Sequence, residues 1–182
     1  MKRCLRLFAI LLLLPLAACL GAPKGVTPIT DFDAARYMGE WFAIMRIENR
    51  FERGLTNVSA TYHLRDDGYV AVLNKGFDRE KCRWRSIEGH AYFQGPPNIA
   101  SLSVRFFWPF AGGYHVIALD REDYAWAMVA GPTRGYLWIL ARQPRLDQAT
   151  LDALMQLAAR LDFPVDELVT VDHAAIDCRS VS

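Results

Sequence analysis

Apolar and polar residues alternate through most of the chain beyond residue 40, which is the pattern of half-buried β-strands. Val58, Ala60 and Tyr62, for example, are apolar, whereas the residues between them are polar. Turn-forming residues such as Asp67-Gly68 separate one alternating run from the next. The pattern predicts eight strands, over residues 41–46, 57–64, 69–74, 87–93, 100–106, 114–120, 124–130 and 136–142.

No helical run interrupts this series of strands, so each strand can pair only with its neighbours through short turns. Such a sheet is antiparallel and up-and-down, and closing it into a ring removes its exposed edges. Eight strands enclose an interior that is either filled by side chains or wide enough for one small ligand. The predicted fold is therefore an all-β, eight-stranded antiparallel up-and-down barrel.

One α-helix is predicted after the eighth strand. Asp147 is a suitable N-cap, apolar residues follow at helical spacing, and Phe163-Pro164 ends the run. A single amphipathic helix must bury its apolar stripe, and the outside of the barrel is the surface available to it. A last short strand is expected over residues 168–171.

The first 18 residues have the pattern of a secretory signal peptide. A basic start precedes an apolar run over residues 7–18, which is shorter than the ~20 residues that cross a bilayer as a helix. The run ends in Leu16-Ala17-Ala18-Cys19, which resembles a bacterial lipobox. Cleavage before Cys19 would free its thiol and amino group for diacylglycerol and palmitate, and a buried helix with an incidental cysteine is the alternative.

The position after Cys19 is Leu20 rather than Asp, and the sorting rule for bacterial lipoproteins then implies the outer membrane, on its periplasmic face. Several acyl chains on one residue give a durable anchor. Residues 19–30 show little periodicity and are expected to be the lipidated N-terminus and a tether. Residues 31–182 are expected to form the folded domain.

Composition and charge exclude two classes of protein. The 182 residues are 52% apolar, which is too high for a disordered chain, and their number suits one domain. Three of the 21 basic residues lie in the leader and none of the 20 acidic residues does, so the rest carries a net charge of −2. No basic patch remains to suggest a nucleic-acid partner.

Two cysteines remain once Cys4 leaves with the leader and Cys19 is acylated. Cys82 and Cys178 would both be in an oxidising compartment, where a disulfide is favoured over two separate thiols, which are the alternative. Their wide separation and the scattered histidines show no ligand spacing for a metal. The sequence therefore predicts neither a metal site nor a cofactor.

Three motifs, in order and at suitable spacing, resemble those of the lipocalin family. Gly39-Glu40-Trp41 opens the first strand, Asp120 ends the sixth and Arg142 ends the eighth. The resemblance spans residues 31–171 and is strongest toward the bacterial outer-membrane lipoprotein branch, in the group that includes the apolipoprotein D-like proteins. Arg121 stands where the family often has tyrosine, which affects only local hydrogen bonding.

These motif residues are expected to be structural. The first and last strands of a closed barrel are neighbours, so Arg142 would stack on Trp41 in a cation–π contact worth ~0.5–2 kcal/mol and close that end. The loops after the first, third, fifth and seventh strands form the opposite, open end, which we call the mouth. A ligand would enter there.

The mouth includes the aromatic segment Phe107-Trp108-Pro109-Phe110, which is costly in water unless it packs on something. It is expected to line the entrance, to contact a lipid surface or to form a homodimer contact, and packing over the barrel rim is the alternative. Arg50 or Arg53 would meet a carboxylate or phosphate there, unless both are ordinary solvated charges. With the more apolar strand faces taken as inside, the ligand-binding candidates are Tyr62, Val72, Asn74, Phe93, Leu102, Val104, Phe106, Tyr114, Val116, Tyr136 and Trp138.

No nucleophile elbow, zinc-protease motif or phosphate-binding glycine loop occurs, so nothing indicates an enzyme. The first hypothesis is a lipid-anchored carrier that stores or transports a fatty acid or lysophospholipid. The alternative is a barrel with a filled interior that acts as a structural or interaction module through its aromatic loop. A third and weaker hypothesis is an enzyme acting on a lipid, which would need an acid–base pair inside the barrel.

Overall fold

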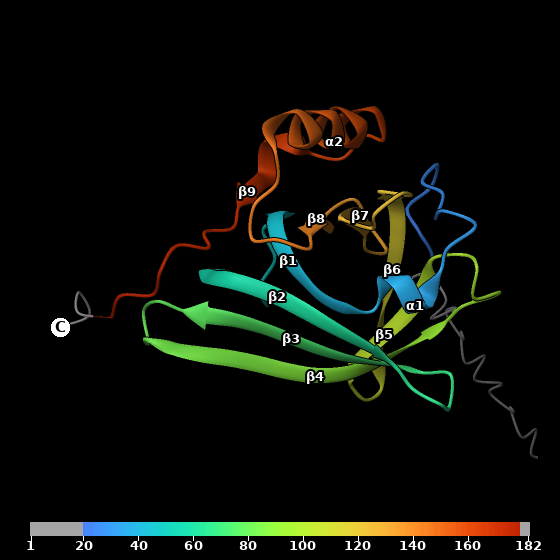
Figure 1. The fold of residues 1–182 in the computed structure, drawn as a ribbon, viewed down its shortest axis with the longest axis horizontal. Coiled ribbons are helices and arrows are strands. Elements are labelled where there is room, and N and C mark those ends of the chain that lie inside the picture. Colours follow the sequence, from blue (N-terminus) through green and yellow to red (C-terminus); the bar gives the residue numbers. More distant parts are fainter. Residues whose placement is uncertain (1–19, 179–182) are drawn as a thin grey trace, which may run out of the picture.

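The eight predicted strands all form, and each pairs antiparallel with the next along the chain (Figure 1). In the computed structural model, which describes residues 20–178, β8 also pairs with β1, for example Phe42 with Ala141. The ring is therefore closed, and the predicted fold class is confirmed. The strands are β1 (Gly39–Ile47), β2 (Leu55–Leu64), β3 (Val70–Asp78), β4 (Arg83–Phe93), β5 (Ser101–Phe107), β6 (Phe110–Leu119), β7 (Trp126–Ala130) and β8 (Leu137–Ala141).

Several strand ends differ from the prediction. β6 begins at Phe110, so the expected loop over residues 107–112 is a tight hairpin in which Phe107 pairs with Phe110. β4 begins four residues early because its exposed polar start hides the alternation. β7 begins two residues late because the Asp120 carboxylate accepts hydrogen bonds from the amides of Glu122 and Ala125 and holds a turn there.

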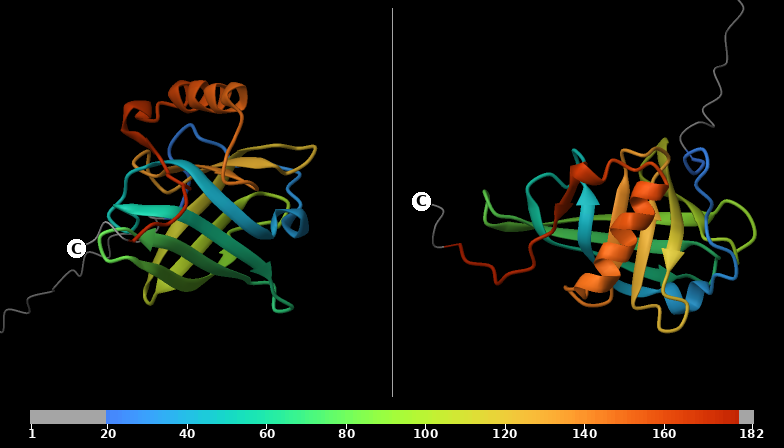
Figure 2. Two further views of the ribbon diagram at one scale, coloured as in Figure 1. Left: turned by 60° about the vertical axis from the view of Figure 1, so that its left-hand side comes forward. Right: turned by 90° about the horizontal axis from the view of Figure 1, so that it is seen from above.

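The helix α2 (Gln148–Arg160) packs on the outside of the barrel, as predicted (Figure 2). Asp147 caps it by accepting a hydrogen bond from the Thr150 amide at 2.9 Å. The apolar stripe of α2, with Leu154 and Ala158, shares a buried cluster with Ile139 on the outer face of the sheet. Among residues 20–178, no helix has the length and apolarity needed to cross a membrane.

The chain then returns to the barrel. A short 3-10 helix η2 (Val165–Glu167) leads into β9 (Leu168–Thr170), which pairs with β1 at Met45–Ile47, beyond the part of β1 that pairs with β2. The following tail is joined to the start of β4 by a disulfide between Cys82 and Cys178, so that prediction is confirmed. The bond closes a loop across a sequence separation of 96, which the chain-entropy model values at ~4–5 kcal/mol.

The expected tether is not a free linker over residues 20–30. The Leu20 carbonyl accepts a hydrogen bond from Gln94 at 2.8 Å, the Ile29 amide donates to the Val116 carbonyl at 2.9 Å, and Val26 is buried. A Cβ on Gly113 would lie 2.5 Å from the Leu20 oxygen, so only glycine allows the segment to cross β6 this closely. An irregular segment held by scattered contacts has no periodicity, which is why the sequence indicated a tether.

Arg142 and Trp41 close one end of the barrel. The guanidinium carbon lies 3.9 Å from the centre of the fully buried indole, as the resemblance implied. The same guanidinium donates hydrogen bonds to the carbonyls of Glu40 at 3.0 Å and Arg36 at 2.7 Å. The indole donates to the Tyr37 carbonyl at 2.8 Å, so one pair of side chains joins β1, β8 and the helix α1 (Ala34–Tyr37).

We expect Arg142→Met to lower the free energy of unfolding by about 2–4 kcal/mol, because it removes the cation–π contact and charge-assisted hydrogen bonds together. Urea unfolding measures the change. Arg121→Met is the matched control, since the exposed Arg121 guanidinium also donates to backbone carbonyls but stacks on no buried ring. An equal loss of stability in both variants would contradict a closing role specific to Arg142.

Candidate functional site

The interior of the barrel is apolar and encloses a small cavity near the closed end. Its volume is about 20 Å³, which is room for about one water molecule. The walls are hydrophobic except for three tyrosine hydroxyl groups. The lining residues are Phe32, Tyr37, Met38, Tyr62, Val70, Val72, Ala91, Phe93, Leu102, Val104 and Tyr114.

Most of the predicted ligand-facing residues lie in the interior. The lining includes six of them, Tyr62, Val72, Phe93, Leu102, Val104 and Tyr114. Two more, Phe106 and Trp138, are partly buried and pack against the same interior cluster nearer the mouth. The Phe106 ring lies against the barrel wall, where a Cβ on Gly89 would come within 2.6 Å of it.

The remaining three predicted positions do not line the cavity either. Val116 is completely buried in the packed core, and Asn74 is half-buried on β3 with a side-chain oxygen that has no hydrogen-bond partner. Tyr136 precedes β8 instead of belonging to it, and its ring stacks on Trp138 with centroids 6.1 Å apart. It is therefore a residue of the mouth rim, because the loop before β8 lies at that end.

The sequence analysis missed the part of the lining that comes from outside the eight strands. Phe32, Tyr37 and Met38 belong to the segment around α1 that crosses the closed end of the barrel. Asp33 caps α1 by accepting hydrogen bonds from the amides of Ala35 and Arg36. An Asp followed by a short apolar run was the available signal, but a four-residue helix is too short to show a period.

The three cavity tyrosines form one hydrogen-bonded group. The Tyr114 hydroxyl lies 2.8 Å from that of Tyr37 and 3.0 Å from that of Tyr62. The rings of Tyr37 and Tyr62 stack with centroids 5.8 Å apart. Two mutual hydrogen bonds use two of the three hydroxyl protons, so the group retains one proton that it can donate to an oxygen in the cavity.

Burial disfavours the ionised form of these tyrosines. It raises the pKa of Tyr62 to about 12 and raises those of Tyr37 and Tyr114 well above their ordinary value. Both neighbouring tyrosines raise the pKa of Tyr114 further, because one phenolate would repel another. For Tyr37, Tyr62 raises the pKa in the same way, whereas the hydrogen bond with Tyr114 lowers it. The three hydroxyl groups at the closed end are therefore polar and uncharged, and they stay so to higher pH than an exposed tyrosine would.

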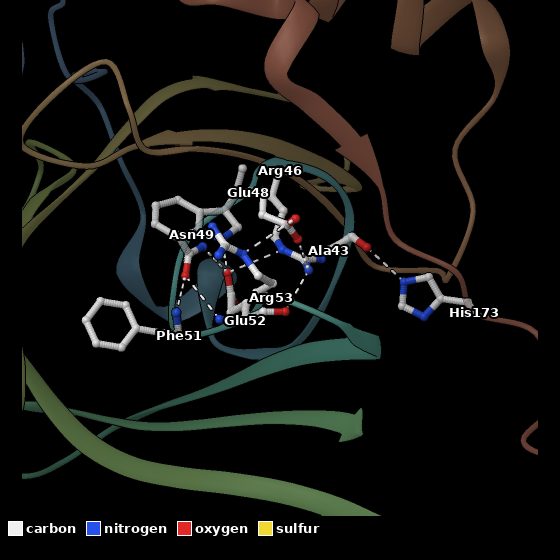
Figure 3. Close-up of polar contacts among 9 residues, drawn as sticks. Ala43, Arg46, Glu48, Asn49, Phe51, Glu52, Arg53 and His173 are labelled. Atoms are coloured by element: carbon white, nitrogen blue, oxygen red, sulfur yellow. Dashed lines mark hydrogen bonds and ion pairs between the residues drawn. The ribbon is translucent and has the colours of Figure 1, made fainter. Parts of the chain in front are cut away.

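A charged cluster of Arg46, Glu48 and Glu52 lies at the mouth (Figure 3), and it is linked to β8 by a hydrogen bond between Glu52 and Trp138. Arg46 is 2% exposed and pairs across the sheet with Trp138, so both side chains point to the same side. One Glu52 carboxylate oxygen accepts hydrogen bonds from the Trp138 indole at 2.9 Å and from Asn49 at 2.6 Å. The same oxygen lies 3.7 Å from the Arg46 Nε.

Arg46 is the buried cation of this cluster. It donates a hydrogen bond to the Glu52 carbonyl at 2.7 Å and forms a second ion pair, with Glu48, at 3.7 Å. Its Nε is buried without a hydrogen-bond partner, so the guanidinium keeps a donor for an oxygen ligand. The predicted Arg50 and Arg53 are instead exposed, with Arg50 over the Phe51 ring and Arg53 at 3.9 Å from Glu48.

The arrangement combines an apolar interior, neutral hydroxyls at its closed end and a buried guanidinium at its mouth. Such a site can hold a molecule with a hydrocarbon part and one polar group. Within residues 20–178, no group of three or more His, Cys, Asp or Glu side chains is placed to hold a metal ion.

Comparison with known proteins gives consistent results. The model of the lipocalin-like domain family matches residues 32–173. Outer membrane lipoprotein Blc of Citrobacter freundii is 52% identical over 149 residues, which cover 82% of this chain and 84% of that protein. Apolipoprotein D of Bos taurus is 32% identical over 183 residues, covering 90% and 95%.

A similar fold is found in insecticyanin from the tobacco hornworm Manduca sexta, with a TM-score of 0.67. The match covers 85% of this chain and 88% of that one at 19% sequence identity. At this level of identity the likeness concerns the fold alone.

The buried tyrosines predict a loss of stability in alkaline solution. Because the folded-state pKa of Tyr62 is raised, its stabilising effect is complete below pH 10 and is lost as the pH rises toward 12. We expect the free energy of unfolding to fall over this range, by on the order of 2 kcal/mol for Tyr62, and Tyr62→Phe to make the fall shallower. Urea unfolding at a series of pH values tests this, and identical pH profiles for the two proteins would contradict it.

The mouth cluster predicts that Glu52 holds the loop of residues 48–54 in place. We expect Glu52→Ala to lower the free energy of unfolding by about 2–4 kcal/mol, because the buried Arg46 loses one of its two ion pairs and keeps only Glu48 and the backbone carbonyl of residue 52. Hydrogen exchange of the loop amides should rise in the same variant. Asp67→Asn breaks an exposed ion pair with Arg65 and is the control; an equally small effect of both changes would show that the cluster does not hold the loop.

Proposed function

The chain belongs to the lipocalin family, and we propose that it is a lipid-anchored carrier that holds one fatty acid or lysophospholipid in its barrel. The proposal describes a binding protein that stores or transports its ligand without changing it. It rests on the family, on the leader of the sequence and on the character of the barrel interior.

The protein is located at the bacterial outer membrane, since relatives at 41–52% identity are named outer membrane lipoproteins. We propose that Cys19 carries the lipid after the signal peptide is removed, which places the barrel at the periplasmic face. Cys19 and residues 1–18 lie outside the described residues. The support for acylation of Cys19 is therefore the lipobox in the sequence. Labelling of cells with a palmitate analogue, compared between the wild type and Cys19→Ala, tests it.

The observation that best supports lipid binding is the incomplete burial of hydrophobic side chains in the barrel interior. Val104, Phe106 and Trp138 face the interior and pack against the core, yet each is only partly buried. A barrel with a fully packed interior would withdraw these side chains from water. A hydrocarbon chain seated against them gains ~0.8 kcal/mol of gross transfer free energy per methylene group, before the costs of association.

The polar end of the ligand fits the mouth. Arg46 offers a buried guanidinium whose Nε makes no hydrogen bond, although it lies 3.7 Å from a Glu52 carboxylate oxygen, and a carboxylate or phosphate is the partner that such a group prefers. Arg50 and Arg53 add exposed positive charge near the same loop. A fatty acid and a lysophospholipid both combine one anionic group with one hydrocarbon chain.

The second candidate function, a barrel with a filled interior that acts as an interaction module, is favoured by the size of the cavity. A volume of about 20 Å³ is far below the ~300–1,000 Å³ of ligand pockets. A lipid must therefore occupy the part of the interior nearer the mouth and displace side chains at the closed end. Direct binding measurements separate the two candidates.

We expect Val104→Glu to weaken the binding of a fluorescent fatty acid at least about tenfold, because a carboxylate would replace the apolar valine side chain beside the alkyl chain of the ligand. Trp138→Ala should weaken it as well by removing a large contact surface. Arg105→Glu is the matched control, because Arg105 neighbours Val104 but points to the opposite side of the sheet.

Displacement of the probe by unlabelled fatty acid or lysophospholipid identifies the preferred class, and native mass spectrometry detects a lipid that co-purifies. The absence of both probe binding and co-purified lipid would overturn the carrier proposal in favour of the filled barrel. Equal effects of Val104→Glu and Arg105→Glu would place the ligand elsewhere on the molecule.

A further inference from the structure

The tip of the β5–β6 hairpin exposes three large aromatic side chains to solvent. Phe107 is 63% exposed, Trp108 is 83% exposed and Phe110 is 77% exposed. Phe107 pairs with Phe110, so only two residues form the turn. A turn this short cannot fold these rings back onto the barrel. Residues 107–112 contain no charged side chain, and an exposed apolar patch of this kind marks a contact surface.

Two other loops at the same end of the barrel carry more basic than acidic side chains. Residues 48–54 and 78–85 together carry six basic and four acidic side chains, although residues 19–182 as a whole are net negative. Phe51 in the first of these loops is 57% exposed, and the Arg50 guanidinium lies 4.7 Å from the centre of its ring. Exposed aromatic rings beside cations match the interface of a bilayer with anionic lipids, where rings sit at headgroup level and cations meet phosphates.

The start of the described chain lies on the same hairpin. Leu20 crosses β6 directly over Gly113, which is three residues from Phe110 and therefore about 10 Å away along the strand. Cys19 directly precedes Leu20 in the sequence. An anchor at Cys19 would therefore hold the aromatic tip close to the membrane, without a long tether to let the barrel turn away.

We propose that Phe107, Trp108 and Phe110 insert into the headgroup region of an anionic phospholipid bilayer, so that the mouth of the barrel faces the membrane. The anchored orientation rests on the proposed acylation of Cys19, whereas the affinity of the tip for lipid does not. In this orientation a lipid passes between the bilayer and the barrel interior without crossing open water. The surface is separate from the interior residues that would hold the ligand.

The affinity is measured by co-sedimentation of residues 20–182 with vesicles of phosphatidylethanolamine and phosphatidylglycerol. This chain contains all the elements of the fold described above, and it lacks the acylated residue, so the tip alone is tested. We expect the double variant Trp108→Ser/Phe110→Ser to bind at least about tenfold more weakly, since each ring removed from lipid costs about a decade in affinity. Both side chains are exposed, so the variant should unfold at the wild-type urea concentration.

Tyr69→Ser is the matched control, because Tyr69 is an exposed aromatic residue at the β2–β3 turn, at the opposite end of the barrel. It should bind vesicles like the wild type. Arg50→Gln/Arg53→Gln should weaken binding several-fold to the phosphatidylglycerol vesicles and have little effect on vesicles of phosphatidylcholine alone.

Absence of vesicle binding by the wild-type chain would overturn the proposal, as would equal binding by the double variant. Loss of self-association in the double variant, with unchanged vesicle binding, would identify the tip as a contact between two copies and would also overturn it. Fatty-acid displacement without vesicles should be unchanged in the double variant. A failure of the carrier proposal would appear in that assay, and a failure of the docking proposal would appear in the vesicle assay.

Discussion

The structure depends on the closure of the sheet by the pairing of its first and last strands. This pairing brings residues almost a hundred positions apart into contact, and Arg142 stabilises it by stacking on Trp41 while donating to carbonyls of the α1 region. An open eight-stranded sheet would leave two unpaired edges and expose its interior face to water. Closure therefore creates the interior, separates a sealed end from a mouth and decides where a ligand can enter.

The two ends of the interior differ in their electrostatics because closure buries different groups at each end. At the closed end, three neutral tyrosines share hydrogen bonds, and burial raises their pKa values further. At the mouth, Glu52 of the first loop contacts Arg46 in an ion pair and accepts a hydrogen bond from Trp138. The half-buried hydrophobic residues between these ends form the surface on which the proposed carrier function rests. The small volume of the enclosed cavity means that ligand entry must be accompanied by movement of side chains.

The segment before the first strand connects the barrel to its proposed anchor. Residues 20–30 are hydrogen-bonded to the barrel through Leu20 and Ile29 instead of hanging free, and Gly113 leaves room for the crossing. A lipid anchor attached to such a segment restrains the orientation of the whole molecule as well as its distance from the membrane. The aromatic tip of the same hairpin would then act together with the anchor.

The sequence by itself determined the barrel, the outer helix and the closing pair, because these depend on local alternation, local helical spacing and motifs at the strand ends. It also placed Tyr62, Val72 and Val104 inside, since every second residue of a strand shares one face. Only the tertiary structure decided that Arg46 is buried beside Glu52, that Phe32 and Tyr37 line the cavity, and that the expected tether is packed on β6. It likewise decided the cavity volume. These features depend on distances between segments far apart in the chain, and the period of a single strand carries no information about such distances.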